Sequence, residues 1–204
     1  MLPNPIKIKV GSKTLQIALK NVTVLVGQNE SGKSITLDSL HIYFCVHHSD
    51  YVALKFDMGL NYSELDLYNL IQKYKKVIGD KITHEFKQTL YSFNLVGHFN
   101  MMLNCNELEL LDYNLNSVSR GVRKLIYLFT SLELHTNKLG EKSIVLIDEP
   151  ETSLHIKYQI ILIESLTNAY PECIFILATH APAIVSNGYK DCIFKMDYIL
   201  TDNK

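Results

Sequence analysis

The sequence predicts an α/β fold in which helices flank a mostly parallel sheet. Three short runs of apolar, largely β-branched residues read as strands that are buried on both faces: residues 22–26, 143–147 and 173–179. Helical patterns stand between these runs, and strands that alternate with helices are typical of parallel sheets. The length of 204 residues and the hydrophobic fraction of 47% suit one domain with a substantial core.

The segment before the first buried strand alternates between apolar and polar residues. Apolar side chains occupy every second position over residues 6–10 and again over residues 15–19, with Gly11 and Ser12 between the two runs. A period of two on each side of a short glycine-containing turn predicts an antiparallel β-hairpin at the N-terminus.

Apolar residues at helical spacing predict three helices beside the buried strands. They span about residues 33–47, 121–134 and 154–170, and Pro171 ends the last of them. We expect Arg123 and Lys124 to lie on the polar face of the second helix.

The stretch over residues 48–106 is more polar and is expected to be largely helical. Ser63 and Asp66 have the spacing of a capping box, which begins a helix there. We therefore expect residues 1–204 to form a single domain, with residues 48–116 inserted as a compact helical lobe.

An octapeptide at residues 27–34, GQNESGKS, fits the pattern G-x-x-x-x-G-K-[ST] and lies between a buried strand and a helix. Its glycines let the backbone curl so that N–H groups face the β- and γ-phosphates of a nucleotide. Lys33 adds a positive charge and the Ser34 hydroxyl a magnesium ligand, while the Glu30 side chain can point to solvent. The predicted nucleotide contacts are Gly27, Asn29, Glu30, Ser31, Gly32, Lys33, Ser34 and Ile35.

Polar residues follow the other two buried strands. Asp148 and Glu149 come directly after one of them, and His180 follows the other. The carboxyl end of a parallel strand is where open α/β sheets bind ligands. Asp148 is placed to hold magnesium, Glu149 to orient and deprotonate a water, and His180 to contact the γ-phosphate or that water. The alternatives are a solvated acidic turn and a structural histidine.

Together these segments resemble the ABC-type ATPases, specifically the SMC, RecF and OLD-like branch. The resemblance covers nearly the whole chain, and its most specific motif is DEPETSLH at residues 148–155. It implies a P-loop NTPase fold of the ABC-ATPase type. By resemblance, Asp148 is the Walker B aspartate, Glu149 the catalytic glutamate and His180 the switch histidine.

The resemblance also implies a signature serine and glycine that bind the nucleotide of a partner subunit. Ser119 and Gly121, at the start of a predicted helix, are the candidates. The alternative is that Ser119 only caps its own helix. Residues after Pro150 would form a D-loop at the dimer interface. The family's Q-loop glutamine is not located, because neither Gln72 nor Gln88 follows a clear strand.

The resemblance implies a hydrolase that uses ATP and Mg²⁺ and forms a homodimer around ATP. Because the predicted core consumes most of the chain, its output is expected to go to a separate effector protein, by resemblance a nuclease or toxin in phage defence or DNA repair. Two alternatives stay open. One is a nucleotide-gated scaffold with negligible turnover, and the other is the ATPase subunit of an ABC transporter.

Charge and hydropathy narrow the partners and the location. The formal net charge is -1, so no global positive field attracts nucleic acid. Binding to nucleic acid stays open only through a local basic patch, formed by Lys73, Lys75, Lys76 and Lys81. No apolar run approaches the roughly 18 residues that span a bilayer, and the N-terminus lacks the pattern of a signal peptide. We expect a cytoplasmic protein with no membrane partner.

Overall fold

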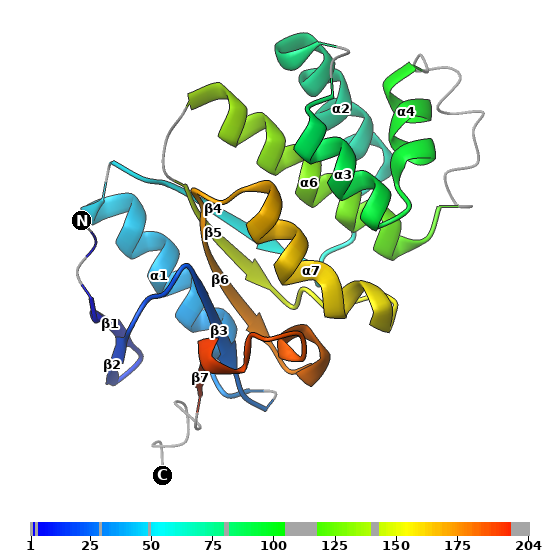
Figure 1. The fold of residues 1–204 in the computed structure, drawn as a ribbon. Coiled ribbons are helices and arrows are strands. Elements are labelled where there is room, and N and C mark those ends of the chain that lie inside the picture. The colour runs from blue at the N-terminus through cyan, green and yellow to red at the C-terminus, as the bar shows by residue number, and fades with distance from the viewer. Residues whose placement is uncertain are drawn as a thin grey trace.

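The computed structural model describes residues 2, 4–28, 30–48, 50–79, 82–104, 118–139 and 143–196. Within these residues a five-stranded sheet has the order β4-β5-β6-β3-β7, and its neighbouring strands are parallel (Figure 1). The strands are β3 (Val22–Val26), β4 (Val52–Asp57), β5 (Ser143–Asp148), β6 (Ile174–Thr179) and β7 (Ile193–Lys195). The predicted parallel sheet is confirmed.

Helices cover both faces of this sheet, which is why all six residues of β5 are buried. On one face, α1 (Lys33–His47) packs with Ile144 and Leu146 in one apolar cluster. On the other face, α6 (Arg120–Leu139) and α7 (Ile156–Ala169) share a second cluster with Val145 and Ile147. Consecutive residues of one strand therefore enter different cores, as the strand pleat requires.

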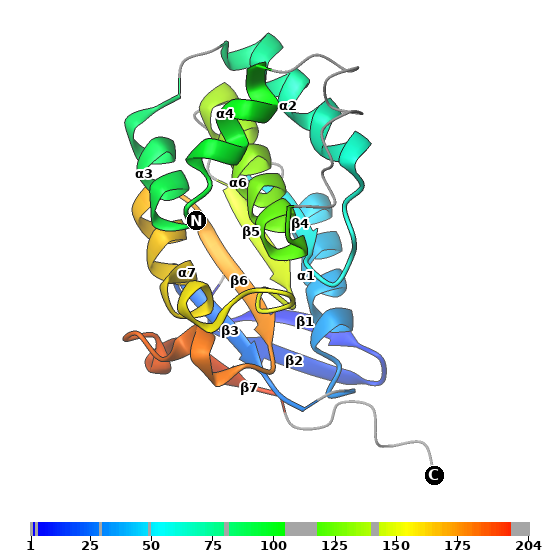
Figure 2. The same ribbon diagram turned by 90° about the vertical axis from the view of Figure 1, so that its right-hand side faces the viewer.

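The N-terminal hairpin forms as predicted from β1 (Ile6–Val10) and β2 (Lys13–Ile17), which pair antiparallel. The alternating burial along β1 places its apolar side chains in the cluster that contains α1. In Figure 2 the hairpin lies at the opposite end of the molecule from α2, α3 and α4.

Three further helices pack outside the sheet: α2 (Glu64–Ile78), α3 (His84–Ser92) and α4 (Val96–Asn104). They share an aromatic cluster in which the Tyr74 and Phe86 rings both contact Phe99. The predicted capping box begins α2, since the Asp66 backbone N–H donates to Ser63 Oγ at 3.1 Å and the Ser63 backbone N–H donates back to Asp66 Oδ2 at 2.9 Å.

The expectation of a largely helical stretch from residue 48 is wrong over β4, which forms an edge of the sheet. Lys55 interrupts its apolar run and pairs with Asp38 of α1, so the segment lacks the continuous hydrophobic pattern of a buried strand. The short strand β7 is a further element that the pattern did not predict. The end of the predicted lobe, at residue 116, lies outside the described residues, so its bounds stay a prediction.

Candidate functional site

The phosphate loop (residues 27–34) connects β3 to α1 at the carboxyl end of the sheet. Two residues have positive φ, namely Glu30 at 67° and Gly32, the N-cap of α1, at 85°. The Glu30 side chain is exposed. Because of these two positive φ angles, the backbone curls before the helix, and the N-terminus of α1 faces the loop. Asn29, a predicted contact, lies outside the described residues.

Gly27 occupies a position where no side chain fits. A Cβ atom there would lie 2.5 Å from Ser31 Oγ and 2.7 Å from the Met196 carbonyl oxygen. Met196 is held in place because its backbone N–H donates to the Val26 carbonyl at 2.7 Å. The end of β7 thus closes against the loop, and this contact makes the first glycine of the motif necessary.

Lys33 keeps its ammonium group inside the phosphate loop. Its side chain is only 8% exposed, and Nζ donates to the carbonyls of Gly27 and Gln28, each at 2.8 Å. The loop therefore joins a lysine charge to the N-terminus of α1, and both attract anions.

Asp148 and Ser34 meet at the edge of the phosphate loop. The Ser34 side chain lies close enough to the Asp148 carboxylate to lower its pKa by hydrogen bonding, so this pair links β5 to the first turn of α1. Asp148 is 5% exposed, and its Oδ1 has no hydrogen-bond partner in the described part of the chain. A buried, unpaired carboxylate oxygen beside a hydroxyl is a donor set that fits Mg²⁺.

Burial raises the pKa of the Asp148 carboxyl above its ordinary value. The hydrogen bond from Ser34 opposes this rise, and the charge of Asp57 adds to it. Asp57 ends β4 and is the direct partner of Asp148 in the parallel register. A Cβ atom on Gly59 would lie 3.0 Å from Asp57 Oδ1 and 3.2 Å from Glu149 Oε2, so this glycine separates two carboxylates.

Asp57 is a site residue that the sequence did not reveal, because its strand was not predicted. The described residues contain no group of three His, Cys, Asp or Glu side chains arranged to hold a metal ion. The fit to Mg²⁺ therefore rests on Ser34 and Asp148, and Asp57 acts on Asp148 through its charge.

Lys124 lies at the same site, which corrects the expectation that it belongs to the polar face of α6. It is buried, and Nζ donates to the Met58 carbonyl. Burial and the Arg120 charge lower the pKa of Lys124, while the charges of Asp57 and Glu149 raise it. A buried cation therefore lies near the carboxylates and ties α6 to the turn after β4.

Glu149 begins the β5–α7 turn (residues 149–155). Its φ is 49°, its backbone N–H donates to Ala178 O at 3.0 Å, and its Oε2 accepts from Thr152 Oγ1 at 3.2 Å. His180 follows β6, the strand beside β5, and its Nδ1 lies 2.9 Å from Glu151 Oε1. Glu149 and His180 thus each follow a buried strand, as predicted, and the structure shows that these two strands are neighbours. Glu151 is a partner that sequence reasoning did not assign.

The two candidate signature residues have roles within their own chain. Ser119 Oγ accepts from the Val122 backbone N–H at 3.3 Å, so Ser119 caps α6, as the alternative interpretation proposed. A Cβ atom on Gly121 would overlap the Ser153 carbonyl oxygen. The start of α6 therefore packs directly on the β5–α7 turn, and Gly121 permits that approach.

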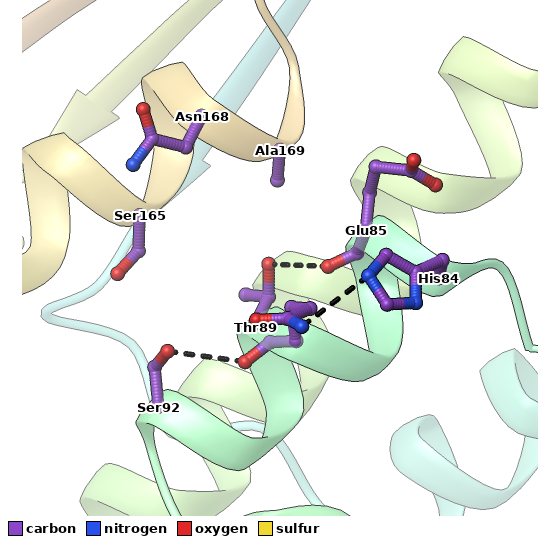
Figure 3. Close-up of a pocket in the computed structure, with 8 residues that line it drawn as sticks. His84, Glu85, Thr89, Ser92, Ser165, Asn168 and Ala169 are labelled. Carbon is purple, nitrogen blue, oxygen red and sulfur yellow. Dashed lines mark hydrogen bonds between the residues drawn. The ribbon is translucent and has the colours of Figure 1, made fainter.

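A cavity of about 280 Å³ lies between α3 and α7, away from these residues (Figure 3). Its lining includes Ser165 and Asn168 near the end of α7, which leads to the amino end of β6. The α3 side bonds within itself, for example His84 with Gln88 at 3.3 Å. Among the residues that the structure describes, no predicted site residue lines this cavity.

A glycine-rich loop between a parallel strand and a helix, with an enclosed lysine and a buried carboxylate beside the serine of the first helical turn, defines a P-loop NTPase. The family model described as "AAA ATPase domain" matches residues 54–185, a segment that contains Asp148, Glu149 and His180. The chain belongs to this family. This membership confirms the predicted class of enzyme, an ATPase of the P-loop type.

Two curated proteins resemble the chain. The Retron Vc95 probable ATPase of Vibrio cholerae serotype O1 biovar El Tor is 31% identical over 135 residues, which are 62% of this chain and 26% of that protein. Protein ea59 of Escherichia phage lambda is 28% identical over 147 residues, which are 67% of this chain and 23% of that protein. The chain thus spans about a quarter of the length of these relatives.

Among solved structures, cbiO1 from Clostridium perfringens, part of the ABC transporter complex cbiONQ, has a TM-score of 0.53 at 14% identity. The match covers 96% of this chain and 83% of that one. This likeness shows the fold, and it confirms the predicted fold of the ABC-ATPase type. In the described residues no helix has both the length and the apolar character to cross a membrane.

Proposed function

We propose that this chain binds ATP with Mg²⁺ in the phosphate loop and hydrolyses the γ-phosphate. The observation that carries the proposal is the juxtaposition of Ser34 and the buried Asp148 carboxylate, whose pKa Ser34 lowers, because it joins the phosphate loop to the acidic end of β5. The loop amides, the N-terminus of α1 and Lys33 bind the phosphates. Ser34 and Asp148 hold Mg²⁺, which when bound neutralises phosphate charge.

Glu149 is the general base in this proposal. The hydrogen bond from Thr152 fixes one of its carboxylate oxygens, so the carboxylate is oriented before a water arrives. It accepts a proton from the attacking water, and His180 contacts the γ-phosphate. Asp57 and Lys124 set the charge around this carboxylate.

Titration calorimetry with MgATP tests the binding step. Lys33→Ala should weaken ATP binding by about tenfold or more, because a phosphate then loses a charge-assisted hydrogen bond of roughly 1.5–3 kcal/mol. Lys9→Ala, at an exposed position of the hairpin, is the matched control and should bind like the wild type. Equal affinity of Lys33→Ala and the wild type would exclude the assigned phosphate site.

We also propose that two chains close around two ATP molecules, as the resemblance to the OLD-like branch implies. Ser119 and Gly121 would contact the γ-phosphate of the partner subunit. The contact of Gly121 with the β5–α7 turn supports this, because it places the start of α6 beside the proposed D-loop. Light scattering should show a dimer of Glu149→Gln in MgATP and a monomer without nucleotide. A monomer in both conditions would exclude this assembly.

A relative that is named as the probable ATPase of a retron supports a role beside other components. We propose a separate effector of the nuclease or toxin type, in phage defence or DNA repair, and a cytoplasmic location. Affinity purification of Glu149→Gln with ATP should recover such an effector. Recovery of a membrane permease would instead favour the transporter alternative. ATP-dependent dimerisation without turnover would favour the scaffold.

A further inference from the structure

Glu151 and His180 form a pair that joins the β5–α7 turn to the end of β6. Glu151 Oε1 accepts the His180 backbone N–H at 3.0 Å and lies 2.9 Å from His180 Nδ1. One carboxylate oxygen thus holds both the backbone and the ring of the same residue. The His180 side chain is 50% exposed, whereas Glu151 is only 6% exposed.

The turn itself fixes where the Glu151 carboxylate lies. The Glu151 carbonyl accepts from the Leu154 backbone N–H at 3.0 Å, and Gln159 Nε2 donates to the Leu154 carbonyl at 2.9 Å. These hydrogen bonds therefore fix the backbone of the turn from which the Glu151 side chain extends to the end of β6. The carboxylate is held in place by the turn, and His180 is held by the carboxylate.

Stability does not account for a carboxylate at this position. Its second oxygen, Oε2, is buried and has no hydrogen-bond partner in the residues that the structure describes. Burying a carboxylate with an unpaired oxygen lowers the stability of a fold, because the charge loses its hydration. The attraction to one partner such as His180 at best offsets this loss. Residues that violate local rules of stability are commonly found at functional sites.

We infer that Glu151 is a positioning residue, which holds the His180 ring with its proton on Nδ1 and leaves Nε2 as the nitrogen that contacts a phosphate oxygen or water. A carboxylate at Nδ1 selects this tautomer because it accepts a hydrogen bond from Nδ1–H and cannot donate one to a bare Nδ1. Metal-bound histidines are oriented by a carboxylate in the same way. Glu151 itself touches no reacting atom.

Nitrogen NMR of the His180 ring tests the inference without any measurement of activity. At a pH where the ring is neutral, the wild type should carry the proton on Nδ1. Glu151→Ala should shift the ring toward the Nε2-protonated tautomer, and Glu151→Gln should retain the Nδ1 proton because its amide oxygen still accepts. A His180→Ala spectrum assigns the signals. An Nε2-protonated ring in the wild type would overturn the inference.

Kinetics provide a second test, which rests on the proposed function. Glu151→Ala should lower kcat for ATP by about 10- to 100-fold, as loss of an orienting partner does elsewhere, with KM changed by less than about threefold. Glu151→Gln should recover most of that loss. A variant that merely loosened the fold would instead show a lower melting temperature in proportion to its lost activity.

A double-mutant cycle shows whether Glu151 acts through His180. If it does, the double variant Glu151→Ala with His180→Ala should turn over within about twofold of His180→Ala alone. Effects that multiply would overturn the inference. If the wild type hydrolyses no ATP, the proposed function fails, yet the NMR comparison still decides the role of Glu151.

Discussion

Asp57 at the end of β4 lies directly beside Asp148 at the end of β5, in register across a parallel strand pair. The two carboxylates belong to segments that are distant in sequence. Burial raises the pKa of Asp148, and the charge of the neighbouring Asp57 adds to this rise. The charged form of Asp148, the proposed magnesium ligand, is therefore disfavoured by its surroundings in the folded chain.

Asp57→Asn should shift the acid limb of the ATPase pH profile to lower pH. Asp57 raises the pKa of Asp148, so removing its charge lowers that pKa and keeps Asp148 ionised in more acidic solution. The amide oxygen still accepts from the Gly59 backbone N–H, which preserves the local turn. Profiles of kcat/KM at saturating Mg²⁺ measure the shift, and Asp50→Asn, at an exposed aspartate, is the control. An acid limb of Asp57→Asn at the same pH as that of the wild type would refute the effect of the Asp57 charge on Asp148.

Asp148→Asn should stabilise the fold while it removes activity. The folded pKa of Asp148 is raised, so its carboxylate costs stability at pH 7, and that cost disappears as the pH falls below the ordinary value of about 4. We expect a gain on the order of 1 kcal/mol at pH 7, or ~2–4 °C in melting temperature. The gain should shrink in acid. A lower melting temperature at pH 7 would contradict this account of the Asp148 carboxylate.

Gly27→Ala should abolish ATP binding and lower the free energy of unfolding by about 1–3 kcal/mol, because the new Cβ collides with Ser31 and the Met196 carbonyl. Gly97→Ala is a matched control. Gly97 lies in α4, where a Cβ meets nothing within 4 Å, so alanine there should stabilise by about 0.5–1 kcal/mol. Calorimetric melting and ATP titration of both variants check the pair. Similar effects at the two glycines would exclude close packing at Gly27.

Ser63→Ala should cost about 1 kcal/mol at pH 7, because it removes the N-cap of α2. Hydrogen bonds from Ser63 lower the pKa of Asp66, so the capping box stabilises the fold above the ordinary carboxyl value and loses that contribution as the pH falls through the lowered pKa. The melting-temperature difference between variant and wild type should therefore narrow below about pH 4. Ser39→Ala, which removes a hydroxyl that donates to the Ile35 carbonyl within α1, serves as control. A difference that is constant with pH would mean that Asp66 contributes nothing.

The sequence predicted most of the fold because its strongest signals are local. The strand that ends at Val26 and the helix that begins at Lys33 follow from short-range patterns, and the structure places both as expected. Strand β4 was not predicted, because Lys55 interrupts its run of apolar residues. Its pairing with β5 is a long-range contact that no local periodicity encodes.

The same reasoning separates the site residues that were predicted from those that were missed. Asp148 and His180 could be read from their places after buried strands. Asp57, Lys124 and Glu151 act through contacts across strands and helices, so each depends on packing that a single sequence does not display. Charge at Lys124 indicated a surface position, yet burial beside carboxylates determines its role.

Steady-state ATP turnover by Glu149→Gln is the most direct test of the central claim. The amide keeps the size of the side chain but cannot take a proton, so turnover should fall by about 10²- to 10⁴-fold while MgATP still binds. Glu172→Gln, at an exposed turn before β6, should hydrolyse ATP at the wild-type rate. Turnover of Glu149→Gln equal to that of the wild type would contradict the assignment of Glu149 as the general base.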